Sequence, residues 1–184
     1  TTITNKHIPL NTSYWEPNNK ILNNDTVPKI YNKSLGQYCY IETENLISTC
    51  SSVFKGQADL KTIKVITENR TIEKSAFENC TNLVTANVSN NGYIGESAFA
   101  GSFTQCCDES SLEVLNTSYI GNSAFQGCTN LVTANVANNG NIGNQAFQNC
   151  TSLANLSLGE DVDSLGNYAF DNCASLKEFS IPDY

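Results

Sequence analysis

Apolar residues recur along this chain at a spacing of 22 to 26 residues. The clearest marker is the dipeptide Ala-Phe, which has a weaker copy at Val53-Phe54. The five full copies are Ala76-Phe77, Ala98-Phe99, Ala124-Phe125, Ala146-Phe147 and Ala169-Phe170. In each of these, an isoleucine or leucine stands five positions before the phenylalanine. A nearly constant period of this length predicts a solenoid, in which each repeat packs on the one before it.

Each repeat ends in a short alternation of apolar and polar residues. In the repeat ending at 136, Leu131 is followed by Ala134 and Val136, with the polar Asn135 between the last two. Such alternation predicts a half-buried strand, and strands from stacked repeats should form a parallel sheet. The stretch from the isoleucine to Ala-Phe is too short for a long helix, so we expect a single turn of α- or 3₁₀-helix on the other face. The sequence "NNG" at 90–92 and 138–140 supplies residues that favour chain reversal.

Residues 75–99 and 123–147 are nearly identical, which indicates a duplication of two repeats. A solenoid tolerates such a duplication because each repeat contacts only its neighbours. The repeat at 94–115 departs from the pattern: Ser102 stands where other repeats have cysteine, and the next leucine is delayed to Leu112. We therefore expect an inserted surface loop at 102–111.

The domain organisation predicted is a flanking segment followed by an array. Residues 1–48 lack the repeat and contain three of the four prolines and the only tryptophan, Trp15. We expect this segment to cap the first repeat, and a linker is the alternative. Residues 49–184 hold about six repeats, one of them degenerate. The last strand pattern, at Phe179 and Ile181, has no cap after it, so we expect an array truncated at the C-terminus or covered by another chain.

The stretches "IGNSAFQGCTNLVTANV" and "LGNYAFDNCASLKEFSI" carry a pattern that resembles the BspA-like leucine-rich repeat, over roughly residues 49 to 182. The resemblance implies a leucine-rich-repeat solenoid of α/β type. Its rungs of about 22–23 residues would form a curved right-handed stack with parallel strands on the concave face. Such repeats occur in surface proteins of anaerobic and oral bacteria and of parasitic protozoa. The resemblance therefore implies adhesion to host matrix or plasma proteins, other microbes or host cells, at an extracellular or cell-surface location.

Eight cysteines are present. Four follow the repeat phenylalanine by three positions: Cys80, Cys128, Cys150 and Cys173. One cysteine per repeat at a constant position predicts a buried structural ladder of free thiols. Cys39 and Cys50 could form a disulfide or remain free, and the adjacent pair Cys106 and Cys107 could be free, pair with each other or bridge chains.

The residues between the buried strand positions should line the concave face, where solenoids commonly bind partners. Aligning Leu112 with Leu131 places Asn116 and Val114 in the outward columns. The candidate binding residues are Thr85, Asn87, Asn116, Thr133, Asn135, Asn155 and Ser157. This face is mostly uncharged, so it predicts either a protein- or glycan-binding surface or a polar ladder that only solvates the sheet.

Composition excludes several other functions. The formal charge is −8, from 10 Lys and Arg against 18 Asp and Glu, which is unsuited to nucleic acid or anionic membranes. The sequence contains no run of about 18 apolar residues, so we expect no segment that inserts into a membrane. The single histidine, His7, and the absence of CxxC give no zinc spacing and no catalytic pair, so we expect no metal, no cofactor and no enzyme. The prediction is a non-enzymatic binding module, and the alternative is a structural spacer without a ligand.

Overall fold

The structure is a computed structural model of the chain. It describes residues 7–9, 29–32, 37–40, 52, 54–56, 58, 60–66, 71–89, 91–105, 109–137, 140–177 and 179.

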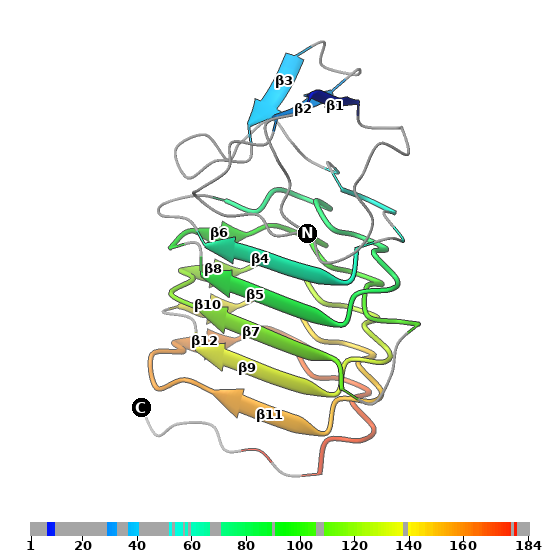
Figure 1. Ribbon diagram of the computed structural model, residues 1–184. Coiled ribbons are helices and arrows are strands. Elements are labelled where there is room, and N and C mark those ends of the chain that lie inside the picture. Colours follow the sequence, from blue (N-terminus) through cyan, green and yellow to red (C-terminus); the bar gives the residue numbers. More distant parts are fainter. Residues whose placement is uncertain are drawn as a thin grey trace.

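Two parallel sheets run the length of the repeat region and form two sides of a β-solenoid of about four turns (Figure 1). The larger sheet has the strand order β11-β9-β7-β5-β4. Its strands are β4 (Thr62–Ile66), β5 (Thr85–Ser89), β7 (Ser111–Leu115), β9 (Thr133–Ala137) and β11 (Asn155–Leu158). The smaller sheet has the order β12-β10-β8-β6, with strands β6 (Tyr93–Ile94), β8 (Tyr119–Ile120), β10 (Asn141–Ile142) and β12 (Ser164–Leu165). The predicted solenoid of stacked parallel strands is thus confirmed.

The side chains that point inward form a continuous core between the two sheets. In β5, β7 and β9 the second and fourth residues are buried, as the alternation predicts. The repeat phenylalanines stack face to face along the axis, with centroid separations of 4.9 to 5.3 Å from Phe54 to Phe170. Offset or parallel packing of rings at such distances adds to the stabilisation from burial. Each phenylalanine therefore joins two neighbouring repeats.

Tight turns take the place of the helical turn expected from the sequence, because the described residues contain no helix. Two residues in each repeat adopt a left-handed conformation, one directly before Ala-Phe and one two positions after the phenylalanine. They include Ser75 and Asn79 in one repeat, and Ser123 and Gly127 in a later one. Left-handed residues interrupt a right-handed helix, so this segment forms successive turns closed by hydrogen bonds over three residues. The expectation of a helical turn was wrong here because each repeat supplies two left-handed residues, four positions apart, in this segment.

Backbone hydrogen bonds also join these turn segments between repeats. The amide of Phe77 donates to the carbonyl of Ala98 at 2.7 Å, and the amide of Phe125 donates to Ala146 at the same distance. The turn side of each coil is thus held to its neighbour as the strands are, which satisfies buried backbone groups without a helix.

Glycine follows the repeat isoleucine because the backbones of adjacent repeats approach closely there. A Cβ atom on Gly121 would lie 2.6 Å from the carbonyl oxygen of Ile94, and one on Gly95 would lie 2.8 Å from the carbonyl of Ile72. Both contacts involve backbone atoms, which cannot move aside as a flexible side chain can. The "IG" dipeptide is therefore a packing requirement of the four-stranded sheet.

The register of β7 corrects the alignment of the repeat that carries the insertion. Leu112 pairs with Ala86, Glu113 with Asn87 and Val114 with Val88. Leu112 therefore does not occupy the position of Leu131, and Val114 is buried instead of facing outward. The insertion hid the register, and a shift of one position reverses which face a strand residue occupies.

A separate sheet of three strands lies in the N-terminal segment. Strand β1 (His7–Pro9) pairs in parallel with β2 (Lys29–Asn32), which pairs antiparallel with β3 (Gln37–Tyr40). Cys39 belongs to β3, whereas Cys50, Cys106 and Cys107 lie outside the described residues. The disulfide between Cys39 and Cys50 and the cap role of 1–48 stay predictions.

Candidate binding surfaces

The repeat cysteines lie in the core and form hydrogen bonds with the turns of the preceding repeat. Each thiol donates a hydrogen bond to the carbonyl of the phenylalanine in the preceding repeat, at 3.2 to 3.3 Å. The four residues are Cys80, Cys128, Cys150 and Cys173, all buried and free of disulfides. Ser102 takes this position in the repeat with the insertion, where its hydroxyl donates to Phe77 at 2.6 Å and accepts the Cys80 amide. The position therefore requires a small hydrogen-bond donor.

The surroundings of these thiols disfavour ionisation. Hydrogen bonding with the neighbouring Cys128 thiol, followed by burial, raises the pKa of Cys150 well above its ordinary value. Burial raises the pKa of Cys173 to about 11, and the nearby Cys150 adds to the effect. A thiol that stays protonated is a poor nucleophile and a poor metal ligand. Among the residues that the structure describes, no group of three His, Cys, Asp or Glu side chains could hold a metal ion.

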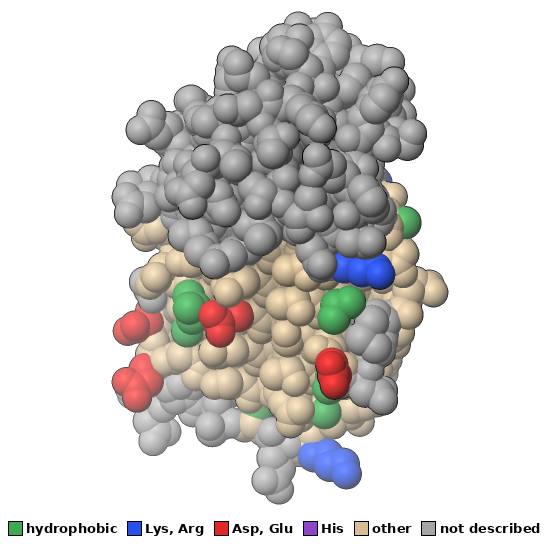
Figure 2. Space-filling view, in the orientation of Figure 1, with side chains coloured by type: hydrophobic (Ala, Val, Ile, Leu, Met, Phe, Trp, Pro, Cys, Tyr) green, Lys and Arg blue, Asp and Glu red, His purple; other side chains and the backbone are tan. Residues whose placement is uncertain are grey.

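The outward face of the five-stranded sheet carries two parallel rows of polar residues, and we call it the polar face. The register places Thr62, Thr85, Ser111, Thr133 and Asn155 in the first row. The second row consists of Asn87, Glu113, Asn135 and Ser157. From Thr85 onward, the side chains in both rows are half-buried or exposed. The space-filling view shows this side of the repeat region as largely neutral, with isolated charged side chains (Figure 2).

Six of the seven predicted residues belong to these rows, and Asn116 does not. Asn116 follows the end of β7, has a φ of 49° and is exposed. Its amide nitrogen lies 3.4 Å from the hydroxyl of Ser89. Glu113 occupies the row position that the sequence alignment assigned to Asn116, so the polar face has a carboxylate near its centre.

The chemistry of the polar face is that of a flat hydrogen-bonding surface. The rows offer hydroxyl and amide groups, and in-row bonds such as that from Asn155 to Thr133, at 3.4 Å, hold neighbouring side chains together. Hydroxyls and amides both donate and accept, so such a face can match the backbone and polar side chains of a protein partner.

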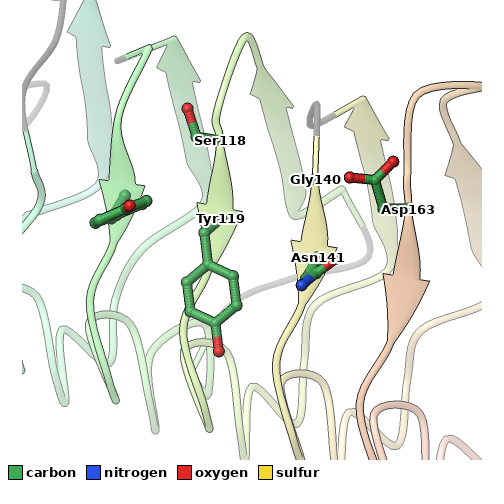
Figure 3. A pocket seen from close by; sticks show the side chains of 6 residues that line it. Ser118, Tyr119, Gly140, Asn141 and Asp163 are labelled. Carbon is green, nitrogen blue, oxygen red and sulfur yellow. The ribbon is translucent and has the colours of Figure 1, made fainter.

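A second surface, which the sequence analysis missed, lies on the four-stranded sheet. The first residues of β6, β8 and β10 are Tyr93, Tyr119 and Asn141, and they are paired in register. Together with Ser118, Gly140 and Asp163 they line an open groove of about 550 Å³, which we call the tyrosine groove (Figure 3). The signal in the sequence was an aromatic residue directly before the repeat isoleucine at positions 93 and 119. A strand of two residues has too little alternation to reveal its outward face.

Together, the two sheets, the phenylalanine stack and the repeated turns define the class as a parallel β-solenoid of leucine-rich-repeat type. A family model described as the BspA type leucine rich repeat region matches residues 18–106 and 100–184, in six copies. The chain therefore belongs to the BspA-type leucine-rich-repeat family. The match begins at residue 18, within the segment 1–48 for which the sequence analysis found no repeat.

Two solved structures resemble the chain in fold. The leucine-rich repeat protein of T. pallidum, TpLRR, is 19% identical, with a TM-score of 0.45 over 70% of each chain. A leucine-rich repeat protein from Bacteroides ovatus is 13% identical, with a TM-score of 0.28 over 88% of this chain and 75% of that one. A comparison with curated proteins gave no match. The part of the chain that the structure describes offers no apolar helix of membrane-spanning length.

Proposed function

We propose that this chain is a non-enzymatic binding module of a cell-surface or secreted protein, which engages a protein ligand through the polar face. Proteins of the host matrix or plasma are the partners that the family resemblance favours. The observation that carries the proposal is the continuity of two polar, mostly uncharged rows across adjacent parallel strands in register. A rigid scaffold that repeats one chemistry along its length suits an extended protein surface.

The rigidity of the polar face supports the same proposal. Each row is held from beneath by buried partners, such as Ala86 and Val88 on either side of Asn87. Ordered side chains lose less conformational freedom on binding than mobile ones do, which lowers the entropic cost of association. The alternative is a structural spacer, for which the polar rows would only solvate the sheet.

The test introduces two positive charges at the centre of the polar face. The variant Asn87→Lys with Asn135→Lys should bind less tightly, because Glu113 lies between the two positions and offers one carboxylate to two lysines, and an incompletely paired charge buried in an interface is costly. Glu160→Lys is the matched control, since it changes the net charge by the same amount at an exposed residue in the turn between β11 and β12, outside both rows. Fibronectin, fibrinogen and other matrix proteins would be immobilised, and saturable binding of each variant would be measured by surface plasmon resonance.

Saturable binding by the wild type and the control, weakened at least tenfold in the double variant, would support the proposal. Binding that the double variant retains would overturn the assignment of the polar face. A wild-type chain that binds none of these proteins would favour the spacer.

A further inference from the structure

The tyrosine groove lies on a different sheet from the polar face, and its chemistry differs. Tyr93 is 56% exposed, which makes it one of three large apolar side chains that are exposed among the described residues. Its ring lies edge-to-face with that of Tyr119, at a centroid separation of 6.0 Å. The pair therefore presents aromatic surface to solvent in a fixed relative orientation. Exposed aromatic rings in a hollow, bordered by polar groups, are typical of a ligand site.

Polar groups continue the groove on the next two turns. Figure 3 shows Tyr119 on one strand with Ser118 directly before it, Asn141 on the next strand and Asp163 beyond it. The Ser164 hydroxyl donates to Oδ1 of Asn141 at 2.9 Å, which fixes the orientation of that amide. The groove thus passes from aromatic surface to hydroxyl, amide and carboxylate groups across adjacent strands, which are spaced about 4.8 Å apart.

The floor of the groove is rigid backbone. The amide of Ser118 donates to the carbonyl of Gly92 at 2.8 Å, and the amide of Asp163 donates to Gly140 at 3.0 Å. A Cβ atom on Gly140 would collide with the carbonyl oxygen of Ser118, so the backbones of the two turns are in direct contact. The groove is therefore formed before any ligand arrives, which lowers the entropic cost of ordering the protein on binding.

The charge of the groove narrows the class of ligand. It has no Lys or Arg in its lining and one carboxylate, Asp163, in a chain of formal charge −8. Phosphate-bearing and acidic ligands would be repelled. A purely apolar ligand would shield these hydroxyl, amide and carboxylate groups from water without offering hydrogen bonds in return, which is costly.

We propose that the tyrosine groove binds an uncharged oligosaccharide that lies across the strands. The C–H face of one sugar ring would pack on the exposed ring of Tyr93, and the hydroxyls of the following sugars would bond to Ser118, Asn141 and Asp163. Tyrosine suits this role because it combines a large apolar face with a polar edge. This site is independent of the polar face and would place a second, glycan-directed surface on the same module.

The experiment probes the full chain with a printed array of neutral and sialylated or sulfated oligosaccharides, followed by titration calorimetry with the neutral glycans that bind. Tyr93→Ala should weaken binding at least tenfold, whereas Tyr93→Phe, which keeps the ring, should lose less than threefold. Tyr168→Ser is the matched control. Tyr168 is 68% exposed but lies outside the groove, and serine holds the equivalent left-handed position in four other repeats.

Neutral glycans bound by the wild type and the Tyr168→Ser control, but lost in Tyr93→Ala, would establish the site. The double variant Asn87→Lys with Asn135→Lys should retain sugar binding, which separates this site from the polar face. Three results would overturn the proposal: no glycan bound by the wild type, equal binding of acidic glycans, or full binding by Tyr93→Ala. Tight binding of a proline-rich peptide in place of sugars would also overturn it, because such peptides use aromatic grooves as well.

Discussion

The thiol ladder offers a sharp test of what holds adjacent repeats together. Cys128 is fully buried, and its Sγ lies 3.3 Å from the carbonyl oxygen of Phe99. Replacing Cys128 with alanine removes that donor and leaves a space the size of the sulfur atom. The Phe99 carbonyl still accepts the amide of Ser102 at 3.1 Å, so it does not lose every partner.

The expected change in the free energy of unfolding follows from the loss of this hydrogen bond and of the buried sulfur. One net hydrogen bond contributes about 1 kcal/mol, and a removed group of methyl size costs about 1 kcal/mol more in lost burial and packing. Cys128→Ala should therefore lower the free energy of unfolding by about 2 kcal/mol. Cys128→Ser keeps a donor at the position where Ser102 already bonds to Phe77, so it should lose about 1 kcal/mol or less.

The assay is equilibrium unfolding in urea, followed by far-ultraviolet circular dichroism, with m-values compared between variants. Cys173→Ala is a useful comparison because Cys173 lies in the last described repeat, at 8% exposure, so its loss should cost less. A serine variant as unstable as the alanine variant would refute the reasoning. It would show that packing of the sulfur, and not donation to the carbonyl, accounts for the cysteine.

Three further predictions follow from the packing and the ionisable groups. Gly121→Ala should lower the free energy of unfolding by about 3 kcal/mol, because the added Cβ would meet backbone atoms. Gly127→Asn should change it by less than about 0.5 kcal/mol, since φ is +72° and asparagine fills this position in other repeats. Equal losses of the two variants in urea unfolding would contradict the argument from close backbone approach. Burial raises the pKa of Glu73 from 4.5, so the unfolded chain releases this proton first and stability falls as pH rises past 4.5. Glu73→Gln should then raise the melting temperature at pH 7 but not at pH 4, and an equal gain at both would argue against ionisation as the cause. The raised pKa values of Cys150 and Cys173 likewise predict that stability declines as pH rises above the ordinary thiol pKa of 9.0. Replacing Cys173 with serine should make this decline less steep in thermal unfolding between pH 8 and 11. An unchanged dependence of melting temperature on pH would refute the prediction.

The repeat length, most of the buried positions and the family resemblance could be predicted from the sequence. Residues such as Phe77, Phe99 and Phe125 recur at one position because each must fill the same space between the two sheets. The cysteine position, and its replacement by Ser102 in one repeat, could also be predicted because every repeat has the same requirement there. Neighbour-to-neighbour packing imposes the same requirement on every repeat, so the pattern repeats in the sequence.

The tertiary structure decided the features that depend on how separate segments meet. The residue that faces outward beside Asn87 is Glu113 and not Asn116, because the pairing of β5 with β7, across an insertion, sets the register. Left-handed residues such as Ser123 replaced the expected helical turn, since the turns bond to the adjacent repeat. The tyrosine groove exists only because Tyr93 and Tyr119, distant in the sequence, occupy the same position on adjacent turns. A single sequence records the local requirement of each repeat, whereas surfaces between repeats arise from stacking.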